Sequence, residues 1–283
     1  MKRKKIVYLI SILTMAIFII VIASSLITPI SRFKIDKSGM YFKGESNLEE
    51  WWFGVFYDKS LDLGGLFDFH IHPGTEKNRL SVLFVGIGNL NTSGFKFFSL
   101  EDCEISKEKA YINTSSDLFE LINESYGRVR LSNVNGNINL TFRKIIEGFI
   151  FEEKNVHIDV PMMWAKVEGC VEDGYKKYEL NGFGYLEHIY GQGRKAGWNW
   201  GVISTNGIGI LFFEGVVDER ILGGAIIADQ NKIIRFIPLR NLKIEFSKND
   251  ESMHIYSKDI GIKVDIYGKK VDEMIMNYTG TII

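Results

Sequence analysis

The chain has 283 residues, of which 46% are hydrophobic and 24% are charged, and it contains only four prolines and two cysteines. This composition excludes an intrinsically disordered chain, a collagen-like repeat and a small disulfide-stabilised domain. The net charge is −1, and four of the basic residues lie within the first five positions. The rest of the chain has no positive field to attract nucleic acid, so we expect no nucleic-acid partner.

The N-terminal segment has the properties of a membrane anchor. No charged residue occurs from Ile6 to Ile30, and the basic residues at positions 2–5 precede this stretch. About 20 apolar residues in a helix cross a bilayer core of about 30 Å, and positive flanks stay in the cytoplasm. Residues 1–30 therefore predict a cytoplasmic stub and a single-pass helix in the cell membrane. The bilayer is then one partner, and the rest of the chain lies outside the cytoplasm.

A cleaved signal peptide is the alternative interpretation of this segment. Its apolar region usually has about 7–15 residues, shorter than the stretch found here, but the small residues Ala23, Ser24 and Ser25 would permit cleavage. An external location would permit a disulfide between Cys103 and Cys170, although two buried free thiols fit the sequence equally well. It would also suit the Asn-x-Ser/Thr glycosylation sites at Asn91, Asn113, Asn123, Asn139 and Asn277.

Beyond Ser31 the hydrophobic pattern has a period of two, which is typical of β-strands. Ile138, Leu140 and Phe142 alternate with polar residues, as in a half-buried strand, and no amphipathic helix of about twelve or more residues is evident. An all-β protein of antiparallel strands follows. The predicted strands are 52–57, 66–71, 80–87, 129–131, 138–142, 149–151, 208–213, 233–237, 242–246, 262–267 and 274–279.

The length of this body allows either one large sheet structure or two barrels of about 125 residues each. Pro161 marks the most reasonable division, because proline cannot donate to a strand ladder. We therefore expect two β domains, one over residues 31–160 and one over residues 161–283.

The segment Asn181–Ser204 is rich in glycine and aromatic residues and contains the adjacent pair Glu187 and His188. Alternation along a strand places these two side chains on opposite faces, so one of them should face inward. Burial raises the pKa of a carboxyl group and lowers that of an imidazole, which suits either group to acid–base chemistry near neutral pH. Trp198 and Trp200 would share a face and form an apolar wall. The alternative is that the tryptophans are core residues and the Glu–His pair is solvated.

Two further clusters could carry chemistry. In the run Glu49–Trp52, adjacent tryptophans must point to opposite faces, so one fills the core and the other meets a lid, a membrane or a ligand. Asp68, His70 and His72 share one face of a predicted strand, a possible zinc-binding arrangement. The alternation equally describes an ordinary strand with a solvated outer face. We favour that interpretation and expect no metal and no cofactor.

These motifs together resemble the carotenoid 1,2-hydratase and AttH-like group of lipocalin-like proteins, which also includes tocopherol cyclases and fungal Diels–Alderases. The resemblance rests on Glu-Trp-Trp at 50–52, Gly-x-Gly-Tyr-x-Glu-His-x-x-Gly at 182–191 and Trp-x-Trp at 198–200. It implies two lipocalin-like barrels or sandwiches in tandem, which bind large apolar molecules, often isoprenoids. It also implies cofactor-free, acid-assisted hydration, cyclisation or cycloaddition. One departure is Tyr190, which stands where the group tends to have tryptophan.

The resulting hypothesis is a membrane-anchored lipocalin-like protein that binds a large apolar ligand. Glu187 would protonate a carbon–carbon double bond, and His188 would orient or reprotonate Glu187. The expected ligand-binding side chains, which would shield a carbocation, are Trp52, Tyr185, Tyr190, Trp198 and Trp200. Two alternatives remain open, namely a lipid carrier without turnover and a cell-surface structural protein.

Overall fold

The computed structural model describes residues 30–45, 48–74, 77–133, 136–153, 156–174, 176–191, 198–205, 207–217, 220–247, 252–257 and 262–267. Within these ranges the regular structure is β-strand apart from three 3₁₀ helices of three residues each. The prediction of an all-β protein is therefore confirmed for this part of the chain. The 3₁₀ helices are η1 (Ile35–Lys37), η2 (Leu100–Asp102) and η3 (Leu239–Asn241).

Thirteen strands form one large antiparallel sheet in the order β5-β4-β3-β2-β13-β12-β10-β9-β8-β7-β6, with β11 pairing with both β12 and β1. Two meanders, β2–β5 and β6–β10, are joined through β12 and β13, so β13 lies between β12 and β2 near the middle of the sheet. The strands are β1 (Ile30–Arg32), β2 (Glu49–Asp58), β3 (Leu63–His72), β4 (Arg79–Gly88), β5 (Ser93–Ser99), β6 (Glu104–Ile105), β7 (Tyr111–Asn113), β8 (Leu118–Asn123), β9 (Tyr126–Asn133), β10 (Gly136–Ile146), β11 (Phe149–Glu153), β12 (Val156–Glu172) and β13 (Lys177–Gly191).

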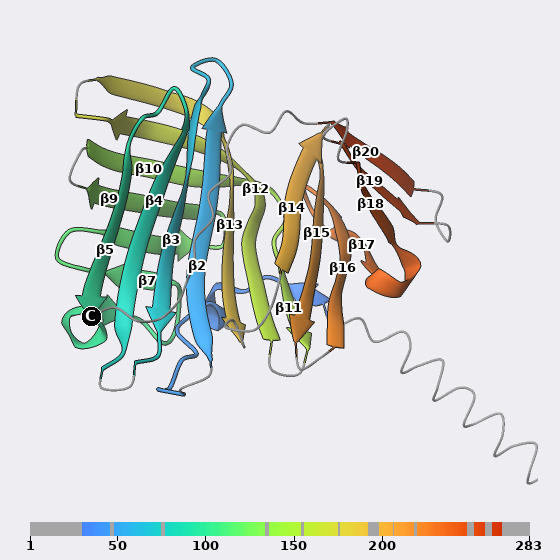
Figure 1. The fold of residues 1–283 in the computed structure, drawn as a ribbon, viewed down its shortest axis with the longest axis horizontal. Coiled ribbons are helices and arrows are strands. Elements are labelled where there is room, and N and C mark those ends of the chain that lie inside the picture. Colours follow the sequence, from blue (N-terminus) through green and yellow to red (C-terminus); the bar gives the residue numbers. More distant parts are fainter. Residues whose placement is uncertain are drawn as a thin grey trace, which may run out of the picture.

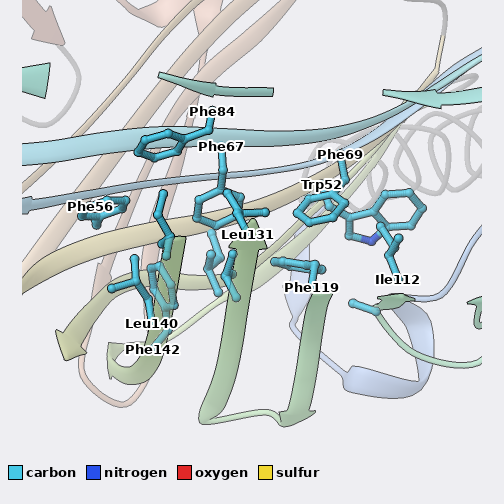
Figure 2. Packing of buried hydrophobic residues seen from close by; sticks show 14 of the residues in the cluster. Trp52, Phe56, Phe67, Phe69, Phe84, Ile112, Phe119, Leu131, Leu140 and Phe142 are labelled. Atoms are coloured by element: carbon cyan, nitrogen blue, oxygen red, sulfur yellow. The ribbon is translucent and has the colours of Figure 1, made fainter. Parts of the chain in front are cut away.

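The large sheet curls so that its two meanders face one another. In Figure 1, β2–β5 pass in front of β7, β9 and β10 and run across them. The main hydrophobic core fills the space between the two parts, with aromatic residues of β2–β4 packed on residues of β7–β10 (Figure 2). Phe67 lies at its centre, with its ring centroid 6.0–6.5 Å from those of Phe69, Phe119 and Phe142.

Alternation along the strands explains which side chains enter this core. In β10, Ile138, Leu140 and Phe142 are buried, as predicted. On the opposite side, Asn137 and Asn139 are exposed and Thr141 is half-buried. The ring of Phe67 also requires a glycine opposite it on β2. A Cβ atom at Gly54 would lie 2.3 Å from that ring, so even alanine would force the ring to move.

A second sheet packs against the outer face of the large one. It has four strands in the order β14-β15-β16-β17, and its apolar residues form a second core with residues of β11, β12 and β13 (Figure 1). A separate three-stranded sheet, β18-β19-β20, follows in the chain. The bounds are β14 (Trp198–Thr205), β15 (Ile208–Val217), β16 (Arg220–Asp229), β17 (Ile233–Pro238), β18 (Lys243–Ser247), β19 (Ser252–Ser257) and β20 (Ile262–Tyr267).

The proposed division at Pro161 falls inside β12, which continues from Val156 to Glu172. The pairing of β12 with β13 is irregular between Asp159 and Ala165, since proline cannot donate a ladder hydrogen bond. The first predicted strand of the body begins a little earlier than expected, at Glu49. The division into domains at residues 31–160 and 161–283 stays a prediction.

The membrane anchor lies almost wholly outside the described residues. Of the predicted segment 6–30 only Ile30 is described, and it begins β1. No helix within the described part of the chain is both long enough and apolar enough to cross a membrane. The predicted strand at 274–279 is also outside the described residues. Cys103 and Cys170 are both free and half-buried.

The central position of Phe67 predicts a large loss of stability on truncation. Phe67→Ala should lower the free energy of unfolding by about 3–5 kcal/mol, because it removes a fully buried ring and leaves a cavity. Phe95→Ala is the matched control, since that side chain is 47% exposed and should cost less than about 1 kcal/mol. Urea unfolding of both variants measures the difference, and equal losses would contradict the proposed core.

Candidate functional site

Glu187 and His188 are adjacent on β13 and point to opposite faces of the large sheet. The sequence predicted that only one of them would face inward, but both are buried, with 5% and 0% of their surfaces exposed. The reason is that β13 is covered on both sides. The main core lies on the His188 face, and the second sheet lies on the Glu187 face. Each face therefore forms a separate environment for one ionisable group.

His188 is held between two carboxylates. Its Nε2 donates to Oε1 of Glu50 at 2.7 Å, and its Nδ1 donates to Oδ2 of Asp159 at 3.1 Å. Burial alone would lower the pKa of His188, but the hydrogen bonds with Asp159 and Glu50 outweigh burial and raise this pKa to about 9. The ring also stacks on Trp52, with centroids 4.4 Å apart and planes within 4°. His188 is thus a buried imidazolium at neutral pH, stabilised by two anions and an aromatic face.

The two carboxylates are themselves satisfied by further contacts. Glu50 also accepts hydrogen bonds from the backbone N–H groups of Tyr41 and Phe42, at 2.8 and 2.7 Å. Asp159 is hydrogen-bonded through Oδ1 to Nε2 of His157 at 2.7 Å. A buried ion pair lacking such bonds would be destabilising, so this completed network fixes β2, β12 and β13 in register.

Glu187 lies in a different environment on the opposite face. The hydroxyl of Tyr185 donates to its Oε2 at 2.8 Å. Trp200 of β14 covers this position, with its ring centroid 5.2 Å from that of Tyr185 and 5.5 Å from that of Phe53. The indole Nε1 of Trp200 is buried and makes no hydrogen bond of ordinary geometry. The carboxyl group is therefore surrounded by aromatic rings and has one firm hydrogen-bond donor.

The pKa of Glu187 is raised to about 7, chiefly by burial. The Tyr185 hydroxyl and the Trp200 indole oppose this rise, while the negative charge of Asp68 adds to it and the charge of His188 lowers it slightly. Burial also keeps the pKa of Tyr185 well above its usual value, so its hydroxyl stays a donor. A carboxyl group with a pKa near neutrality can both give and accept a proton, as general acid–base chemistry requires.

The structure divides the predicted site residues between the two faces. Glu187, Tyr185 and Trp200 lie together on the outer face of the large sheet. His188 and the fully buried Trp52 lie on the core face. Tyr190 is on the core face as well, where it stacks on Tyr41 at 5.8 Å. Trp198 begins β14 opposite Gly215, but its side chain is outside the part that the structure describes.

Sequence reasoning missed the partners of these residues. Glu50 belongs to the run Glu49–Trp52, whose pattern does not indicate a histidine partner, and Asp159 lies in no motif of the sequence. Phe53 was not singled out, although it lies on the neighbouring strand directly opposite Glu187. The available signal was the run Glu49–Trp52 itself, since a charged residue within an otherwise buried strand needs a buried partner.

Two surface hollows are formed by described residues, and neither borders Glu187. One of about 270 Å³ is lined by residues around Met40 and Leu100. The other, of about 660 Å³, lies among polar residues of β9, β10 and β12, including Arg130 and Asn137. The surroundings of Glu187 are therefore the side chains packed between the two sheets, and neither hollow is part of them.

The buried imidazolium predicts a stability contribution that depends on pH. The folded-state pKa of His188, about 9, lies above the usual value of 6.5, so its contribution is complete below pH 6.5 and is lost as the pH rises towards 9. The stability difference between the native chain and His188→Gln should therefore shrink over this range, by on the order of 3 kcal/mol. Urea unfolding from pH 6 to 9.5 measures it, and a constant difference would show that His188 is not charged.

Solved structures share this fold, whereas the comparisons of sequence found no match. No family profile matches the chain, and no curated protein matches its sequence. The crystal structure of a protein from Nitrosomonas europaea, described as a putative AttH, is 10% identical, with a TM-score of 0.54 over 78% of this chain and 82% of that one. CghA with Sch210972 is 9% identical, with a TM-score of 0.54 over 83% and 84%. CghA alone gives a TM-score of 0.51 at 9% identity over 81% and 82%. The resemblance inferred from the motifs is thus confirmed at the level of the fold, which the chain shares with the AttH and CghA structures.

Proposed function

We propose that this protein binds a large apolar molecule against the Glu187 face of β13 and protonates it. The observation that carries the proposal is the buried carboxyl group of Glu187, whose pKa of about 7 leaves roughly half of it protonated at neutral pH. An aspartate or glutamate in water is almost fully ionised at that pH. The packing between two sheets thus gives this glutamate a proton to donate at neutral pH.

The reaction class is acid-assisted addition to a carbon–carbon double bond. The proton of Glu187 forms a new C–H bond at one alkene carbon and leaves a carbocation at the other. Water then forms a C–O bond at the cation and returns a proton to the carboxylate, which gives hydration. If a second double bond within the molecule attacks the cation instead, and a proton is lost to the carboxylate, the product is a ring. Either route regenerates the acid.

The side chains around Glu187 suit such an intermediate. The rings of Tyr185, Trp200 and Phe53 meet edge to face around the carboxyl group and supply π faces that stabilise a cation. These rings also favour a hydrocarbon ligand over a polar one. An isoprenoid, which combines a long hydrocarbon chain with reactive double bonds, fits both properties.

We assign His188 a supporting role across the strand. Its hydrogen bonds are with Glu50 and Asp159 on the core face, so it holds β13 in place and acts on Glu187 through its positive charge. Trp52 stacks on His188 and shields that charge. The likeness of the fold to CghA, a protein crystallised with Sch210972, supports the binding of a small organic molecule by sheets arranged in this way.

Substitution of the acid tests the proposal. The native chain and Glu187→Gln are purified under native conditions, and their organic-solvent extracts are compared by mass spectrometry. The native chain should yield a bound molecule together with a product that is heavier by one water or is an isomer, whereas the variant should yield only the precursor. Glu168→Gln, a change on the exposed part of β12, is the control and should behave as the native chain.

The outcomes separate the two main functions. Product formation by Glu187→Gln at the native level would remove this residue from the chemistry. The same unaltered lipid in both extracts would favour a carrier without turnover. An absence of any apolar molecule from both would contradict the binding proposal.

We also propose that the body is anchored outside the cytoplasm by residues 6–30. The uncharged length and basic flank of that segment support this location, as do the exposed glycosylation-type residues Asn91, Asn123 and Asn139. A tethered protein could take an apolar ligand directly from the bilayer.

Membrane fractionation tests the anchor. The full chain should stay with the membranes after carbonate washing, whereas a chain that begins at Ser31 should not, because it lacks the apolar segment. Release of the full chain would contradict a retained helix. A mature N-terminus near residues 23–25 would identify a cleaved signal peptide instead.

A further inference from the structure

A second cluster of ionisable groups lies on the same face of the large sheet as Glu187. It joins Glu49 of β2 to His70 and His72 of β3, and one potential ligand atom from each lies within 4.8 Å of the others. Glu50 of β2 pairs with Ile71 of β3, and both point to the core face. Their neighbours along the strands, Glu49, His70 and His72, therefore point to the outer face. The sequence pattern had grouped the two histidines with Asp68, whereas the structure adds Glu49 from the neighbouring strand.

We propose that Glu49, His70 and His72 bind a divalent metal ion of the Zn²⁺ type. Two imidazole nitrogens and one carboxylate oxygen are a recurrent ligand set for zinc, and three protein ligands leave the fourth position open for water or another molecule. This proposal concerns residues that the proposed acid chemistry does not use, and it stands independently of it.

The spacing of the ligand atoms suits this ion. Ligands about 2.0–2.2 Å from a tetrahedral zinc ion are about 3.3–3.6 Å from one another. The Nε2 atom of His70 lies 3.6 Å from Oε2 of Glu49. The whole set of ligand atoms lies within 4.8 Å of one another. The rings of His70 and His72 are stacked, with centroids 4.0 Å apart and planes within 25°, so binding requires these rings to turn until both lone pairs point at the ion.

A second layer of contacts holds the histidines in position. Oδ2 of Asp68 lies 3.7 Å from Nδ1 of His70, on the side of the ring away from Glu49. Oδ1 of Asp68 is buried and has no hydrogen-bond partner in the described part of the chain. The hydroxyl of Ser81 contacts Nε2 of His72 at 2.8 Å and fixes that ring. A carboxylate behind a ligating histidine is the usual outer partner in zinc sites.

The balance of charge also favours a divalent cation. Glu49 and Asp68 bring two carboxylates to the partly buried ring of His70, whose side chain is 13% exposed. Two carboxylates attract a divalent cation, and such an ion would use both histidines as neutral ligands.

Metal titration tests the site on the untagged, full-length chain in detergent after dialysis against a chelator. Isothermal titration calorimetry with Zn²⁺ should give one ion per chain at micromolar concentration or below, and Co²⁺ should give the visible absorption of a tetrahedral complex. His70→Gln, His72→Gln and Glu49→Gln should each weaken binding by about tenfold or more. His72 is half-buried at a strand end, so His72→Gln should leave the fold intact. Circular dichroism of each metal-free variant checks this.

His157→Gln is the matched control. His157 also lies between two carboxylates, those of Asp159 and Glu152, but it is not one of the three residues whose potential ligand atoms come within 4.8 Å of one another. This variant should bind Zn²⁺ as the native chain does. The proposal is overturned if the native chain does not bind Zn²⁺ at 100-micromolar concentration, if folded His70→Gln and His72→Gln bind as tightly as the native chain, or if His157→Gln loses as much affinity as they do.

Discussion

The covering of β13 on both faces is the constraint on which the rest of this site depends. A strand with one solvated face would place either Glu187 or His188 in water, and that group would have an ordinary pKa. Here the curled sheet encloses one face and the four-stranded sheet covers the other, so two consecutive ionisable residues are both removed from solvent. Each must then be paired or neutralised, because an isolated buried charge is too costly to keep.

The two residues meet this requirement in opposite ways. His188 keeps its charge because Glu50 and Asp159 supply two anions. Glu50 is held in turn by a hydrogen bond from the backbone N–H of Tyr41. Burial raises the pKa of Glu187 to about 7, and the hydrogen bond from Tyr185 offsets only part of this rise, so about half of the carboxyl groups are protonated at neutral pH. His188 is held by two carboxylates, whereas Glu187 has one hydrogen-bond donor and can give up or take a proton near neutral pH. This contrast, across one strand, favours Glu187 over His188 as the reactive group.

Local pattern predicted much of the fold but few of the contacts. The alternation in β10 and β3 identified strands and their buried faces, because it depends only on neighbouring residues. The partners Glu50, Asp159 and Glu49 could not be found in this way. They lie far from His188 or His70 in the sequence, and alternation says nothing about which distant strands pair. The same limit applies to Trp52 and Tyr190, which the motif grouped with Glu187 but which lie across the sheet from it. Strand β12 passes through Pro161 because its irregular pairing absorbs the missing donor.

The pairing of β1 with β11 has a mechanical consequence. Ile30 is already hydrogen-bonded beside Phe151, and β11 lines the second core together with β12 and β13. If the preceding apolar segment is embedded in lipid, then almost no slack separates the bilayer from folded structure. The body could not then turn freely relative to the membrane, and the outer strand β1 would lie close to the bilayer surface. The orientation of the body would then be set by strand β1 and not by a flexible linker, so the same side of the protein would face the lipid.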